Sequence, residues 1–392
     1  MTELRSMEPS MTQHAVWQPA PFEGANSTVE MCHLRFTSTH GYLNPFDEAC
    51  GSNNRSLGAL FKYYLVRCPL TRGLILDQSQ IDRQHNDHFN YTLLRSVGTA
   101  PTQGALVLLH GLNEKSWKKY WPWAVRLAEL TGRTVVLFPL AYHMNRAPAN
   151  WADPRSMRGV VKERQQLFPH LSNLSFANVA LSQRLQFAPE LFVKSGQQSL
   201  ADLQTLLRQI RQGLHPWLVA DAPVDFFAYS IGATLAEAAL MDDREKLFQE
   251  SRAVLFCGGT TLDRANPVSK AILDSEAALS LKQFFQSPIE ACRALSAEQK
   301  QSLGALLMKK KTEPDWKKLH GRTLVLGLES DTVFSGDALR ETFSEEAVDM
   351  EIFDTPYAAK HENPFAMDQK SPGNGGSLFT KIMQSAADFI AR

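Results

Sequence analysis

One serine stands where the sequence could expose a nucleophile. Residues 224–228 favour a buried strand, and residues 231–241 favour a helix rich in alanine and leucine. Ser230 falls in the turn between them, within the sequence Ala-Tyr-Ser-Ile-Gly. The strand and helix backbones approach closely at such a turn, so it needs small residues on both sides, here Ala228 and Gly232. The pattern predicts a nucleophile elbow, with the hydroxyl at the positive end of the following helix.

A serine nucleophile needs a general base, and the base needs a carboxylate that orients it. Residues 323–327 predict a strand that leads into Asp331, and His361 follows another strand predicted at 350–354. Ser230, Asp331 and His361 therefore each follow a predicted strand, in that order along the chain, and we expect them at one edge of one sheet. The alternative for Ser230 is a simple helix N-cap, because the short serine motif alone has many chance matches.

These positions resemble the α/β-hydrolase superfamily over about residues 100–392. The resemblance rests on the elbow, a Gly-x-x-x-Asp loop, a His-Gly turn and a histidine before the last helix; the alanine that replaces the first elbow glycine occurs in some lipases of the superfamily. It implies that Ser230 is the nucleophile, that His361 is the general base and acid, and that Asp331 orients the imidazole. Two carboxylates of the same loop remain alternatives to Asp331, namely Glu329 and Asp337.

The tetrahedral intermediate of such a reaction also needs donors for its oxyanion. In this architecture they would be the backbone N–H groups of Ile231 and of Leu112, which lies in the turn His110-Gly111-Leu112. We expect His110 to brace this turn by hydrogen bonding rather than to act as a base. Four side chains are candidates for the pocket: His110, Tyr229, His143 and Arg146. An arginine there would bind a carboxylate or phosphate, and a structural ion pair is the alternative.

The elements that must position these residues alternate along the chain. Continuous apolar or β-rich runs predict strands at 31–36, 59–66, 89–96, 105–109, 134–138, 224–228, 253–257, 323–327 and 350–354. Apolar residues spaced by three and four predict helices at 117–128, 199–213, 231–241 and 378–391. This alternation predicts an α/β fold, a doubly wound and mostly parallel sheet of about eight strands.

The spacing of the strands also suggests how the chain is divided. We expect an irregular lead-in with edge strands over residues 1–100 and an α/β-hydrolase domain over residues 101–392. The connections at about 143–198 and 259–320 are too long for simple crossovers. Long insertions on such sheets are usually lids or functional loops, so we expect helical cap elements over the carboxyl ends of the strands.

The composition excludes several function classes. Of 392 residues, 41 are Lys or Arg and 41 are Asp or Glu, so the formal net charge is zero and we expect no nucleic-acid partner. No run approaches ~18 uninterrupted apolar residues, so we expect no membrane span. Five scattered cysteines and an amino terminus without an apolar signal core favour a cytoplasmic location. The sequence contains no signal for a particular oligomeric state.

We therefore expect a serine hydrolase that cleaves an ester, thioester or related acyl bond of a small-molecule substrate through an acyl-enzyme. No cofactor or metal is expected, because the pair His85 and His88 lacks a third ligand nearby. Two alternatives stay open. An acyltransferase or peptidase would use the same triad, and a binding protein would keep the fold without turnover.

Overall fold

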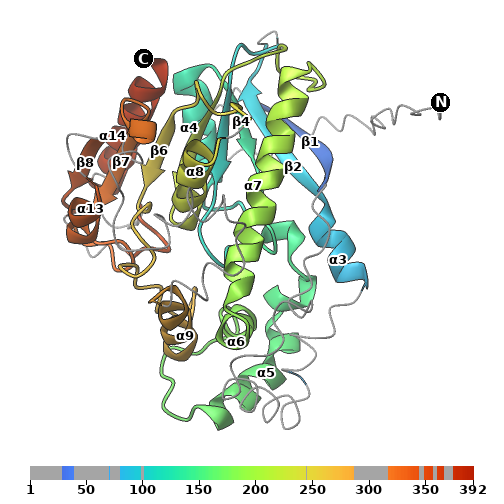
Figure 1. Ribbon diagram of the computed structural model, residues 1–392, viewed down its shortest axis with the longest axis vertical. Coiled ribbons are helices and arrows are strands. Elements are labelled where there is room, and N and C mark those ends of the chain that lie inside the picture. The colour runs from blue at the N-terminus through green and yellow to red at the C-terminus, as the bar shows by residue number, and fades with distance from the viewer. Residues whose placement is uncertain are drawn as a thin grey trace.

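The computed structural model describes residues 29–38, 70, 80–98, 101–243, 245–286, 317–343, 348–355, 360–365 and 374–392. The strand predicted at 59–66 lies outside these residues. The described residues contain one eight-stranded sheet with helices on both faces (Figure 1). This arrangement confirms the predicted α/β-hydrolase fold class.

The sheet is parallel except at one end. Its strands lie in the order β1-β2-β4-β3-β5-β6-β7-β8. The first two strands, β1 (Val29–Thr37) and β2 (His88–Ser96), pair antiparallel, and β2 is also antiparallel to β4. All the other neighbours are parallel: β3 (Ala105–Leu109), β4 (Thr134–Leu137), β5 (Val224–Tyr229), β6 (Ala253–Phe256), β7 (Thr323–Leu328) and β8 (Asp349–Phe353). The carboxyl ends of the parallel strands therefore meet at one edge, where the predicted site residues follow β5, β7 and β8.

Two apolar layers cover the sheet because successive strand residues point to opposite faces. Val107 and Leu109 join the core on one face, and Leu106 and Leu108 join the core on the other. Helices α7 (Glu190–Arg211) and α8 (Ile231–Met241) pack on the first face. Helices α4 (Trp121–Thr131) and α14 (Asn374–Ala391) pack on the second. The parallel strands β3 to β7 are thus buried on both sides, which explains their largely apolar sequences, whereas β8 at the sheet edge is partly exposed.

Three helices begin at residues that differ from the predicted ones. Helix α4 begins at Trp121 rather than at 117, because Pro122 fits the first turn of a helix, where its missing N–H costs no hydrogen bond. Helix α7 begins nine residues earlier than predicted, since Leu191 and Val193 extend its buried face past Gly196. Helix α14 begins at Asn374, four residues before the predicted start.

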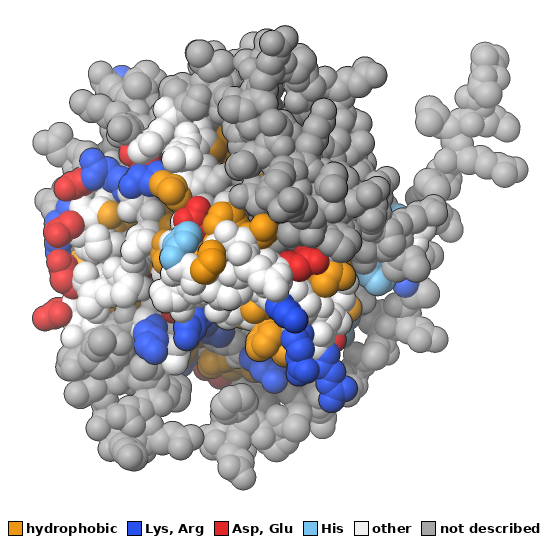
Figure 2. Space-filling model, turned by 90° about the horizontal axis from the view of Figure 1, so that it is seen from below, with side chains coloured by type: hydrophobic (Ala, Val, Ile, Leu, Met, Phe, Trp, Pro, Cys, Tyr) orange, Lys and Arg blue, Asp and Glu red, His pale blue; other side chains and the backbone are white. Residues whose placement is uncertain are grey.

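The two long connections carry short helices. Between β4 and α7 lie η2 (Met144–Arg146), η3 (Ala149–Ala152), α5 (Pro154–Leu167) and α6 (Val179–Phe187). Helix α9 (Ser275–Gln286) lies between β6 and β7, whereas α3 (Gln80–Asp87) and α13 (Gly336–Thr342) flank the sheet. Helices α5, α6 and α9 gather at one end of the molecule (Figure 1). Apolar, basic and acidic side chains lie side by side on that end (Figure 2).

A buried ion pair joins the two connections. The Arg164 guanidinium of α5 donates from Nε and Nη2 to the two oxygens of Asp274, at 2.5 and 2.6 Å. Both side chains are fully buried. A bidentate pair of this kind fixes the orientation of its partners, so α5 and the start of α9 are held together.

Candidate active site

Ser230 lies in a strained turn between β5 and α8. Its backbone has φ 58° and ψ −121°, in the left-handed half of conformational space that residues with a side chain rarely adopt. Two glycines allow the backbones to crowd there. A Cβ on Gly232 would lie 2.8 Å from the Leu109 Cβ, and one on Gly258 would lie 2.9 Å from the Ser230 Cα. The turn thus has the geometry of a nucleophile elbow.

Three of the predicted residues form a hydrogen-bonded chain. His361 Nε2 lies 2.8 Å from Ser230 Oγ, and His361 Nδ1 lies 2.9 Å from Asp331 Oδ2 and 3.0 Å from Oδ1. All three residues are at most 4% exposed. Because a carboxylate only accepts, Nδ1 carries the hydrogen and Nε2 is left to accept a proton from the serine hydroxyl.

The Asp331 carboxylate is held in its charged form. Burial acts to raise its pKa, but the hydrogen bond and charge of His361 and two backbone N–H groups outweigh it and lower the pKa below the usual value. Those N–H groups belong to Val333 and Phe334, which donate to Asp331 Oδ1 at 2.7 and 2.8 Å. The two alternative carboxylates, Glu329 and Asp337, instead pair with exposed Arg340 on the surface.

Tyr229 supports His361 rather than lining a cavity. Its ring stacks on the imidazole with 5.2 Å between centroids and 17° between planes, and its hydroxyl donates to the His361 carbonyl oxygen. The Lys119 ammonium lies 4.6 Å from the centre of the same ring. Tyr229 lies in neither of the two cavities at the site, although the sequence analysis named it as a pocket candidate.

A second tyrosine, Tyr120, supports the turn that carries Leu112. Gly111 N donates to the Tyr120 hydroxyl at 2.9 Å, and that hydroxyl donates to Glu114 at 3.0 Å. His110 acts similarly, because its Nδ1 donates to the Gly111 carbonyl at 2.8 Å and its Nε2 accepts from Leu140 N at 3.0 Å. Both His110 nitrogens are therefore engaged with the backbone. Tyr120 was not predicted, and its spacing in the sequence suggests only helix packing.

Two cavities with shared lining residues lie at this edge. A main cavity of about 360 Å³ is lined by Ser230, and a side cavity of about 100 Å³ is lined by His143. They share four apolar lining residues: Leu112, Phe192, Ile231 and Leu262. The Ile231 amide is the first of α8 and so has no acceptor within the helix. The two amides named as oxyanion donors thus belong to residues that line both cavities.

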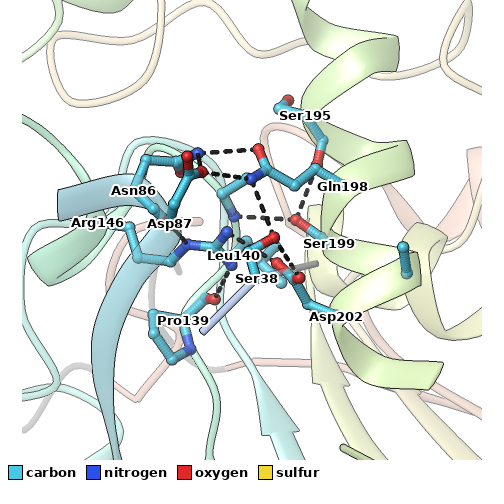
Figure 3. A network of polar contacts seen from close by, with 12 residues as sticks. Ser38, Asn86, Asp87, Pro139, Leu140, Arg146, Ser195, Gln198, Ser199 and Asp202 are labelled. Atoms are coloured by element: carbon cyan, nitrogen blue, oxygen red, sulfur yellow. Dashed lines mark hydrogen bonds and ion pairs between the residues drawn. The ribbon is translucent and has the colours of Figure 1, made fainter. Parts of the chain in front are cut away.

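Arg146 is part of the framework and reaches neither cavity. It is fully buried, and its Nη2 pairs with Asp202 at 2.8 Å (Figure 3). Its Nε donates to the Asn86 carbonyl at 3.0 Å and its Nη1 to the Pro139 carbonyl at 3.1 Å. Arg146 thus forms a structural ion pair, which was the alternative to binding a substrate carboxylate or phosphate. Arg146 and its partners thereby fix the segment after β4, which leads into the side cavity.

Neither a metal centre nor a membrane helix is found in the described ranges. No three of their histidine, cysteine and acidic side chains lie close enough together to hold a metal ion. In the same ranges, no helix is both long and apolar enough to cross a membrane.

Several solved structures resemble this one. A bacterial heroin esterase shares 11% identity, over 94% of this chain and 87% of that chain, with a TM-score of 0.49. A carboxyl esterase from the mycorrhizal fungus Tuber melanosporum shares 13% identity, over 86% of this chain and all of that chain, with a TM-score of 0.45. The hyperthermophilic esterase from Pyrobaculum calidifontis shares 12% identity, over 88% and 94%, with a TM-score of 0.43.

The sequence comparisons give a family but no activity. No curated protein matches the chain. One family model matches residues 22–391, which is nearly the whole sequence and includes every residue of the site described above. The chain belongs to DUF6051, a family of unknown function.

Proposed function

We propose that the protein is a serine hydrolase that cleaves an ester, thioester or related acyl bond through an acyl-enzyme. The observation that carries the proposal is the hydrogen-bonded chain from Asp331 through His361 to Ser230. It ends on a serine in a strained elbow that lines a cavity of about 360 Å³. Backbone strain at a non-glycine residue is typical of active sites, where it is part of the way in which a reactive side chain is positioned.

In the proposed acylation step, Ser230 Oγ attacks the acyl carbonyl carbon while His361 Nε2 takes the hydroxyl proton. The amides of Leu112 and Ile231 donate to the oxyanion that forms. The intermediate then collapses, the bond to the leaving oxygen or sulfur breaks, and His361 gives the proton to the leaving group. The negative charge of Asp331 stabilises the imidazolium while it exists.

Deacylation repeats the same steps with water. The oxygen of a water molecule attacks the acyl-enzyme carbonyl while His361 takes a proton from that water. The second tetrahedral intermediate collapses, the bond to Ser230 Oγ breaks, and His361 returns the proton to the serine. A carboxylic acid leaves and the free enzyme is restored. An acyltransferase would use an acceptor hydroxyl, thiol or amine in place of water, and a peptidase would protonate an amine in the first step.

We also propose that the two long connections form a cap over Ser230. The residues that line the main cavity with Ser230 support this, because most of them come from the segment 262–285. The Arg164–Asp274 pair ties this segment to α5 of the other connection. Asp263, Arg264 and Lys282 bring charge to an otherwise largely apolar lining, so the cap would contribute much of the substrate selectivity.

The first experiment is the detection of fluorophosphonate labelling by intact mass. One adduct on the native chain, none on Ser230→Ala, and one on Ser116→Ala is the expected result. Ser116 is an exposed serine and controls for surface reactivity. The absence of an adduct on folded native protein would contradict the proposal and favour a binding protein. Replacement of His361 by alanine is expected to lower turnover by several orders of magnitude.

Mass analysis of the products separates the alternatives. When a p-nitrophenyl ester is supplied together with a small alcohol or amine, a hydrolase releases only the free acid. The acylated acceptor as the main product would instead identify an acyltransferase. Turnover of a peptide amide at a rate comparable with that of the ester would favour a peptidase.

A further inference from the structure

The side cavity has a largely apolar lining and two polar atoms that form no hydrogen bond with the residues that the structure describes. Its wall is formed largely by apolar side chains: Leu140, Val193, Leu200, Leu235 and Ala238. His143 Nε2 and Thr234 Oγ1 are buried atoms of lining residues, and neither has a hydrogen-bond partner within the described part of the chain. Both residues are 8% exposed. A buried polar atom without a partner costs stability, so such atoms call for an explanation.

The His143 ring is oriented to accept a hydrogen bond at Nε2. Its Nδ1 lies 2.9 Å from the Ala141 carbonyl oxygen, which only accepts, so Nδ1 carries the hydrogen and Nε2 carries a lone pair. Burial, together with the smaller effect of the charges of Lys115 and Arg146, lowers the His143 pKa to about 4, despite the opposing hydrogen bond to Ala141. The ring is therefore neutral at pH 7 and presents an acceptor.

The Thr234 hydroxyl supplies the complementary donor. Thr234 lies four residues after Ser230, which places it one helical turn further along α8. Two other hydroxyls that line the cavity are already used, because Ser195 donates to the Phe192 carbonyl at 2.9 Å and Ser199 donates to the Ser195 carbonyl at 2.8 Å. A hydroxyl group can donate one hydrogen bond and accept another, so its chemistry matches the acceptor of His143 and the donor of Thr234.

The arrangement of the two cavities assigns each to a part of the substrate. His361 must protonate the leaving group, and Phe334, which contacts the imidazole with 5.6 Å between ring centroids, lines the main cavity. The leaving group therefore belongs in the main cavity. The acyl carbonyl would lie at Leu112 and Ile231, which line both cavities. The acyl chain would then extend past these residues into the side cavity.

We propose that the side cavity binds a short acyl chain that carries a hydroxyl group, with His143 accepting from that hydroxyl and Thr234 donating to it. The substrate class is then a hydroxyacyl ester or thioester, and this assignment rests on the proposed hydrolase function. A carboxylate in the same position would face the lone pair of Nε2, and no lysine or arginine of the described ranges lines the side cavity to balance its charge. The site therefore selects a neutral hydroxyl over an acid.

The test compares two p-nitrophenyl esters that differ in one group. The β-hydroxybutanoate ester carries the hydroxyl, and in the isovalerate ester a methyl group of similar size replaces it. Wild-type protein is expected to show a kcat/KM at least about tenfold higher for the hydroxylated ester, since the methyl leaves both polar atoms unpaired. Equal values would overturn the assignment of the side cavity.

Variants of Thr234 and His143 test whether these two side chains cause the preference for the hydroxylated ester. Thr234→Val removes the hydroxyl at nearly constant volume and is expected to reduce the preference to about twofold, whereas Thr234→Ser keeps a hydroxyl and should retain it. His143→Phe removes the acceptor and should act like Thr234→Val. A preference that survives both Thr234→Val and His143→Phe would contradict the proposal.

A binding measurement separates this inference from the proposed function. Titration calorimetry with Ser230→Ala measures the Kd of both esters without turnover. A Kd at least about tenfold lower for the hydroxylated ester supports the side cavity even if wild-type protein shows no hydrolysis. Equal Kd values, or no binding of either ester, overturn the inference even if Ser230 is labelled by a fluorophosphonate.

Discussion

The ring of Tyr229 lies flat against the imidazole of His361, and its hydroxyl donates to the backbone carbonyl of the same histidine. One side chain therefore contacts both the ring and the backbone of His361. Tyr229 directly precedes Ser230 in the sequence, so the elbow that strains the serine also supports the histidine. This arrangement couples the positions of two groups that lie 131 residues apart in the chain.

Replacement of Tyr229 by phenylalanine tests this coupling. The variant keeps the stacking but loses the hydrogen bond to the His361 carbonyl. We expect kcat for a p-nitrophenyl ester to fall about tenfold with little change in KM, because a buried hydrogen bond contributes about 1–1.5 kcal/mol to the position of the base. Tyr229→Leu, which also removes the stacked ring, should lower kcat further. A kcat for Tyr229→Phe equal to that of the wild type would rule out this positioning role.

The close contact between Gly258 and the Ser230 backbone leads to a second prediction. A Cβ at Gly258 would overlap the Ser230 backbone, at 2.9 Å from its Cα. We expect Gly258→Ala to displace the serine and to reduce the rate of fluorophosphonate labelling by at least about a hundredfold, since a 1 Å displacement is enough for such a loss. Gly104→Ala is the matched control, because its Cβ would meet only the Arg133 side chain at an ordinary 3.4 Å. Equal labelling of the two variants would refute the requirement for glycine.

The strands and the candidate triad could be predicted because their signals are local. A parallel strand buried on both faces is a continuous apolar run, and Ser230 and Asp331 each come within three residues of the end of such a run. His361 follows the less buried strand β8. His361 lies within hydrogen-bond distance of both Ser230 and Asp331, as their order along the sheet suggested. The preference for Asp331 over Glu329 and Asp337 is a matter of loop geometry, which the sequence does not encode in a recognisable pattern.

The supporting residues could not be predicted because their partners are distant in the sequence. Arg146 lies 56 residues from Asp202, and nothing in either segment distinguishes a framework ion pair from a substrate-binding arginine. Tyr120 has the spacing of a helix-packing residue, whereas its hydroxyl supports the turn before Leu112. Thr234 lies in an alanine-rich helix, and only the structure shows that it lines the same cavity as His143.

The buried pair between Arg164 and Asp274 predicts where the two connections gain stability. Replacement of Arg164 by methionine leaves the Asp274 carboxylate buried without its partner, which we expect to cost about 3–5 kcal/mol in the free energy of unfolding. Adding Asp274→Asn should recover much of that loss, because asparagine is neutral and retains an oxygen to accept from Ala277 N. Urea denaturation measures both values.

An exposed ion pair provides the control for this prediction. Arg208 and Glu245 also form a bidentate pair, but their side chains are 39% and 53% exposed. Arg208→Met is expected to cost less than about 1 kcal/mol, since water solvates the carboxylate that remains. A loss for Arg164→Met as small as that for Arg208→Met would show that the buried pair does not hold the two connections together.

The buried side chain of His215, which contacts Tyr91 of β2, predicts a pH dependence of stability. His215 Nε2 lies 3.1 Å from the Tyr91 hydroxyl, and burial lowers the pKa of this histidine from 6.5 to about 4. Between these values the unfolded chain binds a proton at His215 and the folded protein does not. The free energy of unfolding therefore falls as the pH decreases from 6.5 towards 4, by up to about 1.4 kcal/mol per pH unit for this one group.

Replacement of His215 by leucine removes this contribution. The decrease in the free energy of unfolding from pH 6.5 to 4.5, measured by urea denaturation at several pH values, should be smaller in His215→Leu than in the wild type. His143 contributes in the same direction in both proteins, so the difference between them isolates His215. His88→Leu, at an exposed position, should keep the wild-type slope. Identical slopes for His215→Leu and the wild type would mean that His215 takes up its proton without a loss of folding stability.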